Sequence, residues 1–185
     1  MAEEYEVDVE WLAFELVPGT PPEGTPRPFK EGETSDLRGH MKDAAEAAGL
    51  TNMRRQQLTP YTIPAFEAGE FAKEQDKFDD FHKSVFRAFW EKGRNIGADD
   101  VLKDIFEECG LDWDEYAVSG GGERYRPTVD RQLMQARTYG ISGVPAFIMD
   151  RYLVSGAQPY EVFQQVMQRI DRDRRDKGLW VPGQQ

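Results

Sequence analysis

Residues 139–150 read YGISGVPAFIMD, and this stretch decides how the rest of the chain is interpreted. Its Gly-Val-Pro turn, residues 143–145, runs directly into a short apolar segment. A proline has no N–H group for a ladder hydrogen bond, so Pro145 belongs at the first residue of a strand or on a sheet edge. Taken alone, the tripeptide fits an ordinary trans proline. Only its surroundings can favour a cis bond, which would turn the chain sharply.

The residues after the turn predict a hairpin and a closing helix. The apolar runs PAFIM at 145–149 and YLVSG at 152–156 are separated by Asp150-Arg151, the length of a tight hairpin turn. Pro159 then opens a helix whose apolar side chains share one face: Val162, Phe163, Val166, Met167 and Ile170.

The N-terminal part predicts a strand followed by a loop. In YEVDVEWLAFEL, residues 5–16, apolar and acidic side chains alternate before the run becomes more continuously apolar, which predicts a strand over 6–16. The next segment, 17–34, is so rich in proline that it can only be a loop.

Several helices should follow this loop. Thr34 or Ser35 can cap the first, with Gly49 just past its end. Pro64 can open a longer helical region up to Trp90, whose apolar stripe is more typical of core packing than of a cofactor site. Asp99 can cap a helix that Gly110 ends, and Asp112 can start a short turn. The expected buried faces are Leu37, Met41, Ala44, Ala45 and Ala48, then Phe78, Phe81, Val85, Ala88 and Phe89, then Val101, Leu102, Ile105 and Phe106.

The glycine run SGGGERYRP at 119–127 predicts a flexible hinge. Successive glycines can approach a phosphate, but no Gly-Lys-Ser/Thr follows and no strand precedes them. We therefore expect the next helix to run from Thr128 to about Tyr139, burying Val129, Leu133 and Ala136.

Composition excludes several classes of protein. The 185 residues carry 34 acidic and 23 basic side chains, a formal charge of −11, which makes nucleic acid an unexpected partner. No basic leader followed by an apolar run opens the chain, and no stretch approaches eighteen apolar residues, so we expect neither a signal peptide nor a membrane span. The single cysteine, Cys109, allows no internal disulfide and predicts a cytoplasmic protein.

Two segments carry a resemblance to a known family. They are VFRAFWEKGRNIGADDVLKDIFEECGLD at 85–112 and ARTYGISGVPAFIMDRYLVSGAQPYEVFQQVM at 136–167. With them the chain resembles the DsbA family, in the FrnE-like branch beside the 2-hydroxychromene-2-carboxylate isomerases. The resemblance implies an α/β, thioredoxin-like fold with a large helical insertion, whose first strand and first helix are absent. It implies an incomplete core of residues 1–58 and 119–185 and an insertion of residues 59–118.

The resemblance also implies a binding site. Active members of this protein disulfide oxidoreductase family open with a strand and a Cys-Pro-x-Cys turn at a helix start, where the helix dipole stabilises a thiolate. Their Gly-Val-Pro loop lies beside that cysteine pair and offers backbone groups to a substrate peptide. Val144 and Pro145 match this loop, so we predict that they bind substrate and that their peptide bond is cis. This chain has the loop without the cysteine pair.

No other residue stands out as catalytic or metal-binding. Cys109 lies near the end of a predicted helix, where the dipole disfavours a thiolate, and it has no partner for exchange. His40 and His82 lack the spacing of a metal site. We therefore expect no catalytic residue, no metal and no cofactor.

Two functions remain open. The first is a DsbA-like oxidoreductase, acting on a peptide or protein thiol, that lacks its N-terminal unit through cloning, a misplaced start codon or a genuinely shortened product. Such a chain should be inactive in redox chemistry. The second is a non-redox peptide or small-molecule binding module, or a relative of the glutathione-dependent isomerases. In either case a missing central strand would leave residues 6–16 to pair with 146–149, or with a second copy in a homodimer.

Overall fold

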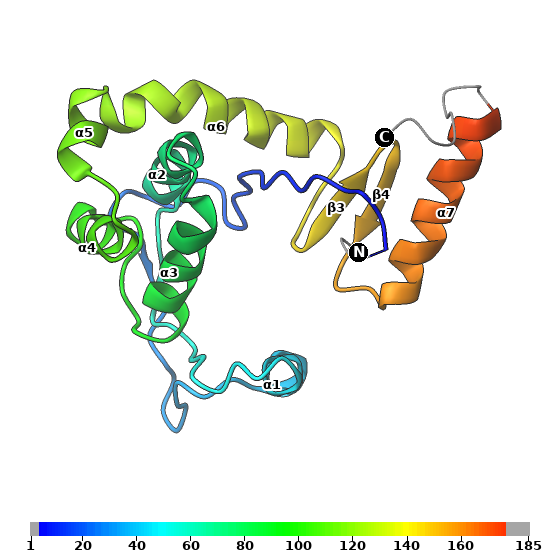
Figure 1. Cartoon of the computed structure of the whole chain (residues 1–185). Coiled ribbons are helices and arrows are strands. Elements are labelled where there is room, and N and C mark those ends of the chain that lie inside the picture. The colour runs from blue at the N-terminus through cyan, green and yellow to red at the C-terminus, as the bar shows by residue number, and fades with distance from the viewer. Residues whose placement is uncertain (1–3, 177–185) are drawn as a thin grey trace. The chain divides into compact units, whose positions relative to one another are not determined.

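The computed structural model describes residues 4–176, which divide into two compact units (Figure 1). One unit comprises residues 17–133, and the other combines residues up to 16 with residues from 134 onward. The predicted division into a core of residues 1–58 and 119–185 and an insertion of residues 59–118 rests on the family resemblance. The two compact units do not test it, so it stays a prediction.

The larger unit is built around helices α2 (Ile63–Glu74), α3 (Phe78–Trp90), α4 (Asp99–Cys109) and α5 (Trp113–Val118). The predicted apolar stripe of α3 is core, because Phe81, Val85 and Ala88 are buried. The predicted buried face of α4 is confirmed as well. Pro64 lies in the first turn of α2, and Asp112 caps α5 by accepting hydrogen bonds from the amides of Asp114 and Glu115. Asp99 does not cap α4, because it is the first residue of the helix. The N-cap position is occupied by Ala98, which has no side-chain group to cap the helix.

Aromatic rings fill the centre of this unit. Phe106, fully buried on α4, stacks on Phe71 with ring centroids 5.6 Å apart and meets Trp113 edge-on at 5.1 Å. Tyr116 and Tyr125 complete the cluster around Phe71. These rings bury a large apolar area in favourable relative orientations, so they supply much of the unit's stability.

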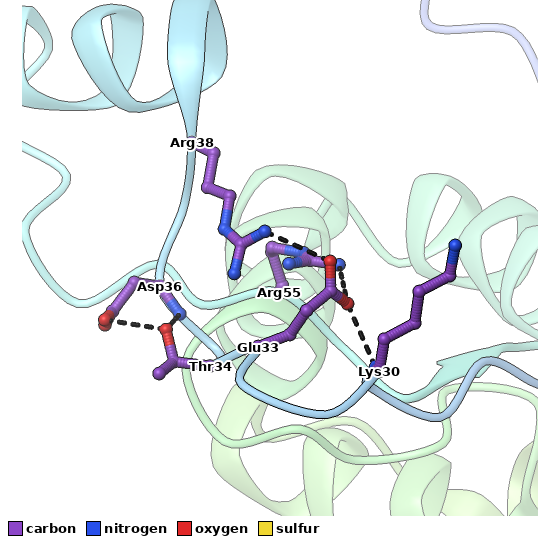
Figure 2. Close-up of polar contacts among 6 residues, drawn as sticks. All are labelled: Lys30, Glu33, Thr34, Asp36, Arg38 and Arg55. Atoms are coloured by element: carbon purple, nitrogen blue, oxygen red, sulfur yellow. Dashed lines mark hydrogen bonds and ion pairs between the residues drawn. The ribbon is translucent and has the colours of Figure 1, made fainter.

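Helix α1 (Gly39–Ala47) begins later than predicted. Thr34 and Ser35 do not cap it: Thr34 Oγ1 donates a hydrogen bond to Asp36, and Arg38 precedes the helix without a side-chain cap. The segment before α1 is held instead by Glu33, whose carboxylate pairs with Arg38 at 3.0 Å and Arg55 at 3.3 Å (Figure 2).

Two short strands tie the proline-rich segment to the rest of this unit. Strand β1 (Thr25–Pro26) pairs antiparallel with β2 (Leu58–Thr59), an arrangement that the sequence pattern does not predict. Glu33 also accepts a hydrogen bond from the Lys30 amide, which is the main cause of its lowered pKa. The predicted loop at 17–34 is therefore held at its middle by β1 and near its C-terminal end by the Glu33–Arg55 ion pair.

Helix α6 (Gly121–Thr138) corrects the predicted hinge. Gly121, Gly122 and Pro127 lie within this helix, which starts seven residues before the predicted Thr128. Glycine and proline disfavour helix interiors, but Tyr125 is buried in the aromatic cluster and holds this first part in place. Tertiary packing has overridden local propensity.

The smaller unit contains the hairpin and the last helix. Strands β3 (Ala146–Met149) and β4 (Tyr152–Ser155) pair antiparallel, with Ile148 opposite Leu153, and α7 (Tyr160–Asp176) lies along the hairpin (Figure 1). The predicted hairpin and closing helix are confirmed. Phe147 meets Phe163 of α7 edge-on at 4.9 Å, so this face of the hairpin is the one that α7 covers.

Residues 6–16 do not form the predicted strand. Their backbone has no strand assignment, and within residues 4–176 the one strand partner of β3 is β4. The alternating pattern is real, but a strand exists only where another strand pairs with it. This unit consequently buries few apolar side chains and exposes many, namely Val9, Trp11, Leu12, Leu16, Met134, Tyr139, Val144, Phe147, Ile148, Leu153 and Tyr160.

Candidate functional site

The candidate site is the loop between α6 and β3. Helix α6 is ended by Gly140, whose φ of 67° lies in the left-handed region that glycine adopts without steric cost. The amides of Gly140 and Ile141 close the last turn by donating to the carbonyls of Arg137 and Ala136. The chain then leaves the helix as an irregular segment up to Pro145.

The Val144–Pro145 peptide bond is cis, as predicted. Pro145 stands immediately before β3, which begins one residue later than expected, at Ala146. The carbonyl of Pro145 accepts a hydrogen bond of 2.8 Å from the Gly156 amide, just past the end of β4. The loop is therefore attached to both strands of the hairpin.

Val144 is exposed to solvent in this loop. The residue is 58% exposed, and within residues 4–176 neither its amide nor its carbonyl forms a hydrogen bond with another backbone group. Tyr139, Ile148 and Leu153 of the same unit are exposed as well. Free backbone groups beside apolar side chains are what an extended peptide requires for pairing.

Cys109 belongs to the helical unit, where its side chain packs in the hydrophobic core. It is the last residue of α4, is buried, and its sulfur lies 3.6 Å from Ser84 Oγ. Val144 and Pro145, in contrast to Cys109, belong to the other unit. A buried thiol among apolar side chains behaves as a small hydrophobic group.

The two histidines show no ligand geometry. His82 lies between the rings of Phe78 and Phe86, at 5.3 and 4.7 Å, and burial lowers its pKa. His40 is exposed on α1. Across residues 4–176 no group of three or more His, Cys, Asp or Glu side chains could hold a metal ion. In the same range, none of the helices has the length and apolar character needed to cross a membrane.

Sequence reasoning missed two polar clusters. One surrounds Glu67 on α2, and the other joins Tyr152 to Asp173. Glu67 could have been noticed, because it is an acidic residue on a helix face that is otherwise apolar. The Tyr152–Asp173 contact joins residues 21 apart on two elements, and no local pattern signals it.

The comparisons with known proteins agree with this geometry. The sequence model of the DSBA-like thioredoxin domain family matches residues 1–168 of this chain. The uncharacterized protein YwbO of Bacillus subtilis is 33% identical over 168 residues, 88% of this chain and 82% of YwbO.

Solved structures carry the same likeness. A probable DsbA oxidoreductase, SCO1869 of Streptomyces coelicolor, is 28% identical with a TM-score of 0.61, and the match covers 77% of this chain but only 60% of that one. A candidate protein disulfide isomerase of Nitrosomonas europaea shares the fold at 17% identity, with a TM-score of 0.55 over 72% of each chain. The α/β, thioredoxin-like fold with a large helical insertion is thereby confirmed.

Proposed function

The chain belongs to the DSBA-like thioredoxin domain family, and from this premise we propose that it binds an extended peptide or protein thiol substrate at the Val144–Pro145 loop without performing dithiol–disulfide exchange itself. We also propose that it stands in the FrnE-like branch and works in the cytoplasm, a reducing compartment that suits a protein with one thiol.

The observation that supports the binding proposal is that Val144 is exposed and, within residues 4–176, forms no hydrogen bond with another backbone group. An exposed residue whose amide and carbonyl are both available can pair with a peptide backbone as one strand pairs with the next. The neighbouring β3 extends this row of backbone groups, and apolar side chains flank it. Main-chain hydrogen bonds would supply affinity, and the side chains around them would supply selectivity.

The thiol content supports the second half of the proposal. Exchange requires an attacking thiolate and a second sulfur that resolves the mixed disulfide. The 185 residues contain one cysteine, and it is buried within the helical unit. Peptide binding can therefore proceed in this chain without the chemistry that its oxidoreductase relatives are named for.

Two substitutions at one position test the binding site. A fluorescently labelled, extended peptide with one reduced cysteine is titrated with the parent chain and with Val144→Ala and Val144→Pro. Proline removes the amide donor and alanine keeps it. We expect Val144→Ala to bind nearly as the parent does. Val144→Pro should lose about five- to tenfold in affinity, the effect of roughly one hydrogen bond.

Circular dichroism of both variants establishes that the fold is intact. Equal affinity of the two variants and the parent would show that the peptide does not use the backbone of Val144. Absence of binding by the parent, with the helical unit folded, would remove the proposal altogether.

A further inference from the structure

A carboxylate is enclosed where α2 meets the first turn of α6, within the helical unit. Glu67 is buried on a face of α2 that also carries buried Ala68 and Phe71. Its Oε1 atom lies 3.8 Å from Nη1 of Arg126, which also contacts Asp130 and the hydroxyl of Tyr61. One charged partner at this distance compensates burial only in part.

The start of α6 is shaped around this carboxylate. A Cβ atom on Gly122 would lie 2.2 Å from Glu67 Oε2 and 2.9 Å from its Cδ, and 3.4 Å from the Tyr116 hydroxyl. The carboxylate thus fills the space in which any other residue at 122 would place its side chain. Of the glycines that the sequence suggests as a hinge, Gly122 is the one that contacts this acidic side chain.

We propose that Glu67 is a proton-sensitive latch, which in its neutral form seats the glycine-rich first turn of α6 on α2 and which loosens that turn when it ionises. The helix on which the latch acts, α6, also leads to the proposed binding loop. Residues 121–133 of α6 belong to the helical unit, and the same continuous helix ends at the loop that carries Val144.

The electrostatic surroundings of Glu67 determine whether the latch loosens with rising or with falling pH. Burial raises the pKa of Glu67, Arg126 opposes this, and Asp130 adds to it. Tyr116 of α5 also interacts with the carboxyl, and its own pKa is raised by burial and then by Glu67. Because the folded-state pKa exceeds the ordinary one, the stabilisation is fully present below the ordinary pKa. It is lost as the pH rises through the folded-state value.

Amide hydrogen exchange, read by NMR at each pH and corrected for intrinsic rates, tests the latch. In the parent, protection of the amides at 122–126 should fall as the pH rises from the ordinary carboxyl pKa through the raised folded-state pKa of Glu67. The fall should approach tenfold per pH unit between the ordinary and folded-state pKa. In Glu67→Gln, which keeps the shape and cannot ionise, protection should be independent of pH. Glu107→Gln, an exposed residue of α4, is the matched control and should follow the parent.

Equal pH dependence in the parent and in Glu67→Gln would overturn the latch. If that variant does not fold, the carboxyl carbon of Glu67 is titrated by NMR in the parent. A pKa at or below the ordinary value would overturn the proposal equally. Neither readout depends on peptide binding, so the latch and the proposed function fail separately.

Discussion

The hydroxyl of Tyr152 donates a hydrogen bond of 2.5 Å to Oδ2 of Asp173, and this contact joins β4 to α7. Arg151 pairs with the same carboxylate, and Arg169 donates to the Tyr152 hydroxyl at 3.1 Å. Both guanidinium groups also lie against the Tyr152 ring. In a unit with few buried apolar side chains, this polar cluster is a main attachment between hairpin and helix.

Replacing Tyr152 with phenylalanine should raise the pKa of Asp173. The hydrogen bond from Tyr152 is the largest cause of the lowered pKa of this carboxyl, ahead of Arg151. A lowered pKa means that the contribution to stability is present above the ordinary pKa and lost as the pH falls through the folded-state value. An NMR titration of the Asp173 carboxyl should move upward in Tyr152→Phe. It should stay in place in Tyr139→Phe, and an unmoved Asp173 in both variants would contradict the assignment.

Gly122→Ala should destabilise the helical unit, although alanine is the better helix former. We expect a loss of about 1–3 kcal/mol in urea unfolding, because the new methyl group collides with the Glu67 carboxylate. In the background of Glu67→Ala the same substitution should be neutral or stabilising by up to about 1 kcal/mol. Additive effects in this double-mutant cycle would mean that the two residues are not in contact.

Phe106→Ala should be among the most damaging core substitutions. The ring is fully buried between Phe71 and Trp113, so its removal should cost about 3–5 kcal/mol in the free energy of unfolding. The control is Phe86→Ala on α3, a residue that is 53% exposed, and its effect should stay within about 0.5 kcal/mol. Comparable losses in the two variants would place the core elsewhere.

The purified chain should neither reduce insulin nor oxidise a reduced peptide above background. Cys109→Ser should behave like the parent, because one buried thiol cannot complete an exchange cycle. Turnover that is clear in the parent and absent in the variant would make Cys109 a working nucleophile.

A second copy is another partner that the edge of β3 can take in the absence of a peptide, because within residues 4–176 this strand pairs only with β4. Two such edges related by a twofold axis can pair with each other and satisfy their backbone groups. We expect light scattering to show a dimer for the parent and a monomer for Ile148→Lys, since lysine protects natural sheet edges. A monomeric parent would exclude the pairing.

The sequence predicts the elements that are decided locally. The hairpin at 146–155 follows from a tight turn between two apolar runs, and the faces of α3 and α4 follow from their spacing. The same reasoning fails for residues 6–16, because no pattern within a strand reveals whether a partner stands beside it. It fails at α6 for a related reason, since the residue that shapes Gly122 is Glu67, far away in the chain.

The candidate site divides in the same way. A tripeptide motif singles out Val144 and Pro145, whereas the lack of a backbone hydrogen bond at Val144 within residues 4–176 became visible only once its neighbours were placed. Glu67 and Asp173 acquire their character from partners on other elements, so their shifted pKa values could not be anticipated.

The exposed apolar side chains of the smaller unit also set how the protein behaves in bulk solution. The net charge of −11 is what keeps such surfaces apart, through mutual repulsion between whole molecules. Added salt shortens the reach of that repulsion to about 3 Å at 1 M, and acidification toward the isoelectric point near 4.7 abolishes it. Solubility should therefore fall with rising ionic strength and pass through a minimum in mild acid.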